Sequence, residues 1–161
     1  MRLLRRLLIA SALAALAVST AHADVVLSGG GRWPSGHGGP QPVGALAWRA
    51  RLTSDWSSEI RGSRTGASCA LRLDGRPWRI RDLALQPAFA AGVELARTGQ
   101  GALLRTTGYH VETALSMPLP EGTALELSAR WVVHGDDGPR VPEDFASHHA
   151  EVTLGFVFRI E

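Results

Sequence analysis

Histidines and acidic residues gather in a stretch that also carries glycine and proline. His134, Asp136 and Asp137 come first, and the pair His148-His149 follows further along. Imidazole and carboxylate groups bind divalent metals, so the set raises the question of a metal site. Adjacent residues of an extended chain point in opposite directions, and two neighbouring histidines rarely bind one ion together. We interpret the set as a solvated polar loop and predict no metal site.

A pair of carboxylates offers a second kind of chemistry. Glu112 and Glu126 lie on two neighbouring runs of residues that a short break separates, so they could face each other as a general acid and a general base. Arg130 belongs to the same run as Glu126. A salt-bridged interior explains both carboxylates without catalysis. We therefore expect no catalytic residue and no cofactor here.

Strands must position these residues, because the last third of the chain alternates apolar and polar residues with a period of two. The three runs cover residues 104–118, 123–134 and 148–161. Side chains of a strand point alternately to opposite faces, so each run has one apolar and one largely polar face. Strands that cross a bilayer at a tilt need about 9–11 residues, which these runs supply.

Similar patterns over the rest of the chain predict eight strands: 24–32, 43–53, 58–73, 77–85, 88–97, 104–118, 123–134 and 148–161. Within 58–73 the apolar residues change from one alternating set of positions to the other, and a bulge near Gly66 explains this change. Gln86-Pro87 separates strand 77–85 from strand 88–97. The connections after strands two, four and six are short, and those after strands one and seven are long. This asymmetry is typical of transmembrane barrels, and an even strand number places both termini on one side.

The leader and the charge limit the possible compartments and partners. Met1–Ala23 carries three arginines, an apolar core and the small-x-small site Ala21-His22-Ala23, which predicts a secretory signal peptide and leaves 24–161 as one domain. The leader holds three of the 17 basic and none of the 15 acidic residues, so 24–161 has 17 − 3 = 14 basic against 15 acidic groups. This near-neutral charge argues against nucleic acid as a partner. Because open backbone edges are unstable in lipid, membrane entry would require a closed barrel.

The polar faces predict what fills such a barrel. If the apolar faces point outward, eight charged residues point inward: Arg49, Arg51, Glu94, Glu112, Glu126, Arg130, Glu151 and Arg159, with Arg79 and Arg81 as weaker candidates. An eight-stranded barrel is just wide enough for side chains to fill, so opposite charges would form a plug. A soluble barrel would reverse the faces. The leader, and an apolar face without charges in the middle of the last four strands, favour lipid outside.

Three segments resemble small bacterial outer-membrane barrels of the OmpA, OmpX and opacity-protein type. They are Leu85–Glu94, with Pro87, Phe89 and Ala91-Gly92-Val93, then Gly108–Trp131, and the closing Gly155-Phe156-Val157-Phe158. The resemblance implies an all-β, eight-stranded antiparallel up-and-down barrel of the transmembrane type. It also implies contact with outer-membrane lipid and insertion by the barrel assembly machinery. The tryptophans of the chain would supply the girdles of aromatic residues at the two membrane interfaces.

A second resemblance suggests an enzyme. In lipid A deacylases, which are eight-stranded barrels, a His-x-Ser-Asn pattern follows the penultimate strand and a Glu on the last strand orients the His. The chain is similar in having Val133-His134-Gly135-Asp136-Asp137 and Glu151 at these places. Asp136 stands where the nucleophilic Ser is needed, and ester hydrolysis by this route requires an activated hydroxyl.

We therefore predict a non-catalytic, small outer-membrane barrel with a structural or surface-interaction role, whose specificity lies in loops near 33–44 and 135–147. Two alternatives stay open. One is a lipid A deacylase-like esterase using His134 and Glu151, and the other is a soluble periplasmic barrel that binds a small apolar ligand. The pattern leaves the oligomeric state undetermined.

Overall fold

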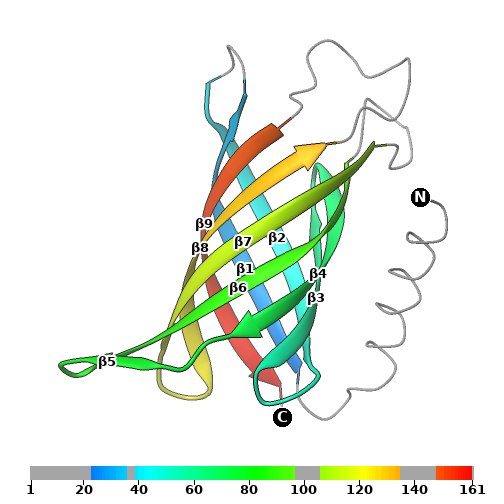
Figure 1. Ribbon diagram of the computed structural model, residues 1–161. Coiled ribbons are helices and arrows are strands. Elements are labelled where there is room, and N and C mark those ends of the chain that lie inside the picture. Colours follow the sequence, from blue (N-terminus) through cyan, green and yellow to red (C-terminus); the bar gives the residue numbers. More distant parts are fainter. Residues whose placement is uncertain (1–22, 36–38, 97–105, 135–147, 161) are drawn as a thin grey trace.

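The computed structural model describes residues 23–35, 39–96, 106–134 and 148–160, and the predicted leader lies outside this part except for Ala23. Within these residues all the regular secondary structure is β-strand, joined by turns (Figure 1). The strands are β1 (Ala23–Pro34), β2 (Gln41–Arg51), β3 (Trp56–Ser63), β4 (Gly66–Asp74), β5 (Trp78–Ile80), β6 (Leu83–Ala96), β7 (Thr106–Pro118), β8 (Thr123–His134) and β9 (His148–Ile160).

The strands close into a barrel. Each pairs antiparallel with its neighbours in the order β4-β3-β2-β1-β9-β8-β7-β6-β5, and a further pairing of β4 with β6 completes the ring. Because β5 pairs only with β6, eight of the described strands make up the barrel wall. The predicted fold, an eight-stranded antiparallel up-and-down barrel, is confirmed. The described residues contain no helix that could span a bilayer.

The barrel has two distinct ends. Ala23 pairs with Ile160, so the first and last described residues lie together at one end, which we call the terminal end. The turns 52–55 and 119–122 and the β5 segment also lie there (Figure 1). At the opposite end, which we call the loop end, Pro34 pairs with His149. The last residues of β6 and β8 lie at this end, and so does the turn between β3 and β4.

The predicted strand 58–73 is wrong. It consists of two antiparallel strands, β3 and β4, joined by a turn at Arg64-Thr65 with Ser63 opposite Gly66. The parity change that suggested a bulge is the effect of this turn, because Ile60 and Cys69 are directly paired across it. A turn formed by residues without the usual Asn-Gly or Asp-Gly signal is hard to locate from the sequence.

The predicted barrel strand 77–85 is also wrong. Trp78–Ile80 pairs with Leu83–Leu85 in a short hairpin that continues β6 beyond the wall and extends sideways at the terminal end (Figure 1). Arg81 turns the hairpin with a φ of 55°. Gln86-Pro87 does not interrupt β6, which runs from Leu83 to Ala96. The predicted strand 58–73 becomes two wall strands, and the predicted strand 77–85 is not part of the wall. The number of wall strands among the described residues is therefore still eight.

The predicted asymmetry of the connections holds only in part. The turns 52–55 and 119–122 at the terminal end are short, as expected. However, the two-residue connection Arg64-Thr65 lies at the loop end, and the β5 hairpin makes the connection from β4 to β6 at the terminal end longer than expected.

The glycine run of β1 does not weaken the strand. β1 pairs along its length with both β2 and β9, through Gly29, Gly30 and Gly31. A Cβ on Gly30 would collide with the carbonyl oxygen of Val152 and lie 2.8 Å from Thr153 Cα. Glycine therefore permits a close approach of β1 to β9 that a side chain would block.

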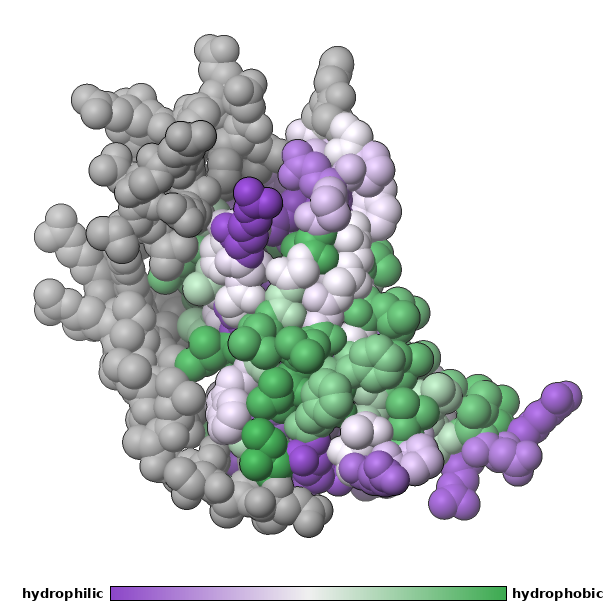
Figure 2. Space-filling model, turned by 180° about the vertical axis from the view of Figure 1, so that it is seen from behind, coloured by the Kyte–Doolittle hydropathy of each residue, from purple (hydrophilic) through white to green (hydrophobic). Residues whose placement is uncertain are grey.

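Alternation gives the barrel an apolar outside and a polar inside. Large hydrophobic side chains such as Leu46, Phe89, Leu127 and Leu154 are about half exposed and face outward. On the face seen in Figure 2 such residues form an apolar belt, with hydrophilic residues above and below it, and exposed large hydrophobic side chains occur on strands all around the wall. Inside, the buried apolar side chains are small, with Val26, Ala47 and Val157 forming one cluster. Small residues leave the interior volume to charged side chains.

Candidate functional site in the charged lumen

Strand register brings opposite charges together inside the barrel. Arg49 on β2 is opposite Glu59 on β3, and Arg130 on β8 lies between Glu112 on β7 and Glu151 on β9. Cross-strand neighbours on one face are about 4.5–5.5 Å apart at Cβ, so these long side chains meet. Among the described residues, five arginines and five glutamates line the lumen: Arg32, Arg49, Arg61, Arg72, Arg130, Glu59, Glu94, Glu112, Glu126 and Glu151.

Glu126 is the centre of the network in the terminal half of the lumen. Its carboxylate accepts hydrogen bonds from Arg49 Nη2 at 3.0 Å and Arg72 Nη2 at 2.7 Å, and from the hydroxyl of Ser116 at 2.8 Å. Arg49 also donates to Glu59 at 2.8 Å. The four charged residues are nearly inaccessible to solvent, and charge-assisted bonds offset part of the cost of burying their charges.

Arg130 organises the middle of the lumen. Its Nη2 lies 3.0 Å from Glu94 Oε2 and 3.0 Å from Nδ1 of His110. The His110 ring fits there because Gly92 is opposite it on β6, where a Cβ would lie 2.7 Å from His110 Cε1. Arg61 and Glu112 form a longer pair at 3.5 Å.

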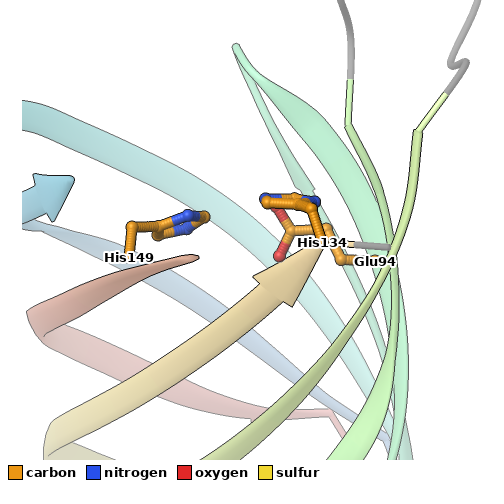
Figure 3. Close-up of side chains that lie close together, drawn as sticks. All are labelled: Glu94, His134 and His149. Carbon is orange, nitrogen blue, oxygen red and sulfur yellow. The ribbon is translucent and has the colours of Figure 1, made fainter. Parts of the chain in front are cut away.

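Histidines gather at the loop end. Arg32 Nε donates to Glu151 at 2.7 Å, and His149 Nε2 lies 3.3 Å from the same carboxylate. The rings of His134 and His149 stack with centroids 5.4 Å apart and an interplanar angle of 29°. Glu94, from β6, brings its carboxylate beside His134 (Figure 3). One potential ligand atom from each of Glu94, His134 and His149 lies within 4.8 Å of the others, and all three residues are buried.

The predicted interior charges divide into two groups. Arg49, Glu94, Glu112, Glu126, Arg130 and Glu151 are buried in the lumen. Arg51 and Arg159 are exposed and line the mouth at the terminal end, where Arg159 Nε is 3.8 Å from Asp24. The weaker candidates Arg79 and Arg81 are exposed and belong to the hairpin outside the wall, so their prediction as interior residues is wrong.

Sequence reasoning missed Arg32, Glu59, Arg61 and Arg72. Glu59 and Arg61 alternate with outward residues on β3, and Arg72 does so on β4. The period-two signal was therefore present, but the wrong assignment of 58–73 as one strand concealed it. Arg32 follows the glycine run and has no alternating pattern before it.

The alternative catalytic arrangements find little support in the geometry. His134 and Glu151 both point into the lumen, where His149 rather than His134 contacts the Glu151 carboxylate. The nucleophile position at Asp136 lies outside the described residues. Glu112 and Glu126 bind different arginines, Arg61 in one case and Arg49 with Arg72 in the other. They are arranged as ion pairs, not as an acid and base sharing one substrate.

The strand geometry separates the adjacent histidines of the set of residues that we considered, and rejected, as one group of metal ligands. His149 points inward, whereas the ring of its neighbour His148 packs at a tilt against Trp131, with ring centroids 5.4 Å apart. This is the opposite orientation expected of adjacent strand residues. Asp136 and Asp137 lie outside the described residues. The grouping of His134 with His149 and Glu94 was not expected, because these residues come from three different strands.

Side chains fill the lumen. The cavities lined by the described charged residues have room for roughly a single water molecule each. The described part of the lumen is therefore a packed polar core.

Comparisons with known proteins identify the fold. No protein-family model and no curated protein matches the sequence. Among solved structures, the barrel is similar to the crystal structure of Neisserial surface protein A, with a TM-score of 0.59 and 13% identity over 85% of this chain and 95% of that chain. At this identity the likeness establishes the barrel fold, which two largely different sequences share.

Proposed function

We propose that this chain is a small bacterial outer-membrane β-barrel protein with a non-catalytic, structural or surface-interaction role. The observation that carries the proposal is the placement of the two faces. Large apolar side chains form the outer belt, and paired charges fill the lumen. Water would not favour so large an exposed apolar surface, whereas the hydrocarbon core of a bilayer would. The likeness to a protein named for its surface location agrees with this proposal.

The two alternatives are less consistent with the described residues. A soluble barrel that binds an apolar ligand needs an apolar cavity, but this lumen is charged and packed. An esterase of the lipid A deacylase kind needs an activated hydroxyl beside its base, but Asp136 stands where that hydroxyl is required. In our proposal the barrel contacts outer-membrane lipid, is inserted by the barrel assembly machinery, and presents the 135–147 connection and the β1–β2 connection at the surface.

Cell fractionation tests the location. The full chain, expressed with its leader, should sediment with outer membranes, resist extraction by carbonate, and migrate faster on gels before heating than after. An epitope inserted within 135–147 should bind antibody on intact cells, and one inserted in the turn 119–122 only after permeabilisation. Recovery in the soluble periplasmic fraction would reject the proposal. A change in the acyl pattern of lipid A on expression, read by mass spectrometry, would instead indicate the esterase.

A further inference from the structure

We propose that Glu94, His134 and His149 form a binding site for a divalent transition-metal cation of the Zn²⁺ type at the loop end of the lumen. Two imidazoles and one carboxylate are the ligand set of many zinc sites that keep a fourth position for water. Borderline cations such as Zn²⁺ prefer this mixture of nitrogen and oxygen ligands over an all-oxygen site. The proposal does not depend on the location of the barrel.

The separations of the ligand atoms suit this occupant after a small adjustment. Tetrahedral zinc with bonds of about 2.0–2.1 Å places its ligand atoms roughly 3.4 Å apart. The three candidate atoms lie within 4.8 Å of one another, and each residue belongs to a different strand of the barrel wall. To reach this geometry, each ligand atom would have to move by roughly 1 Å. Figure 3 shows the two rings and the carboxylate directed toward one another.

Glu94 has an unused capacity to bind a cation. Its Oε2 lies 3.0 Å from Arg130 but accepts no hydrogen bond from the described residues, although the carboxylate is buried. A buried carboxylate oxygen without a hydrogen bond is costly, and a metal ion would satisfy it. If Glu94 bound a metal ion, the positive charge of Arg130 would still have negative neighbours, because Glu112 and Glu151 are directly opposite it on the two adjacent strands.

Glu151 can orient the histidine. Metal-binding histidines commonly give their other ring nitrogen to a carboxylate, which fixes the ring and its tautomer. His149 Nε2 is 3.3 Å from Glu151, so this carboxylate would act as a positioning residue behind His149. Arg32, which also contacts Glu151, has a side chain that is 15% exposed and lies near the mouth. It can move toward water when a cation adds positive charge.

Metal binding to the full mature barrel, purified without a polyhistidine tag in detergent micelles, tests the site. Equilibrium dialysis against Zn²⁺ should give one ion per chain, and Co²⁺ should give visible absorption bands of a nitrogen–oxygen site. Glu94→Gln, His134→Gln and His149→Gln should each weaken Zn²⁺ binding more than about tenfold. Each variant is first checked for heat-modifiable migration, and the Co²⁺ spectrum is the second readout.

Three matched variants keep the proposal falsifiable. His148→Gln changes the adjacent histidine on the other face, His110→Gln changes a deeper lumen histidine, and the double variant Asp136→Asn with Asp137→Asn changes the acidic residues of the neighbouring connection. All three should bind Zn²⁺ like the unaltered chain. Absence of stoichiometric binding, or binding that survives both Glu94→Gln and His149→Gln, would overturn the site. Loss of binding in the Asp136 and Asp137 variant alone would also do so.

Discussion

Single residues inside this barrel act as members of charge networks. Glu126 bonds to two arginines and a serine, and its neighbour Glu59 shares Arg49 with it. Arginines and glutamates are balanced among the described lumen residues, so the loss of one carboxylate leaves a buried positive charge. Removing one partner of a buried pair is more harmful than replacing both by apolar residues.

At this scale we predict that Glu126→Gln lowers the free energy of unfolding by roughly 3 kcal/mol, because Arg49 and Arg72 lose their shared negative partner. Urea unfolding of the barrel in micelles measures the change. Glu121→Gln is the matched control, since Glu121 is exposed in the β7–β8 turn, and it should alter stability by less than about 0.5 kcal/mol. Equal stability of the two variants would show that Glu126 is not central to the network.

The β5 hairpin is an element that lies outside the closed ring of strands. β4 pairs with β6 from Gly66 opposite Ala96 to Asp74 opposite Ala88, so closure is complete before the hairpin begins. Among the described strands β5 pairs only with β6, and its Trp78 and Ile80 are exposed. The hairpin therefore adds surface at the terminal end but does not help to close the wall.

We expect a chain in which Asn-Gly replaces Arg76–Gln86 to fold into the same barrel. Gly75 N donates to the Pro87 carbonyl at 2.8 Å, so these residues already stand opposite each other. A two-residue Asn-Gly turn can span these opposed residues; because Pro87 has no N–H, the turn keeps only the bond from Gly75 N. Heat-modifiable migration and the urea midpoint should stay close to those of the full chain. Failure of the shortened chain to fold would mean that the hairpin is needed to close β4 onto β6.

On the scale of the whole molecule, the apolar outer belt determines whether the barrel is more stable in lipid or in water. Leu127 lies in the middle of β8, where it pairs with Leu115 and Leu154, and is 51% exposed. Leu83 on the hairpin is 52% exposed but lies beyond the wall. The two side chains are equally accessible, and they differ in whether lipid would surround them.

Leu127→Arg should therefore destabilise the barrel in lipid bilayers by about 2–4 kcal/mol, while Leu83→Arg should have an effect of less than about 1 kcal/mol. The comparison is made by unfolding in vesicles and by the amount of each variant recovered in outer membranes. If Leu127→Arg were harmless and increased the amount of soluble protein, the belt would not face lipid.

Local alternation was enough to predict most of the wall. The runs 104–118, 123–134 and 148–161 agree with β7, β8 and β9 to within a few residues. The pattern also separated outward residues such as Trp131 from inward residues such as Glu126. This information is local, because successive side chains of any strand point to opposite faces.

Only the tertiary structure decided which inward residues meet. Glu94, His134 and His149 are far apart along the chain and converge because barrel closure and strand register place the ends of β6, β8 and β9 at one mouth. The same closure showed that 58–73 forms two strands and that β5 lies outside the wall. Alternation determines the face of a residue, whereas its partners across the lumen depend on non-local pairing that no single strand encodes.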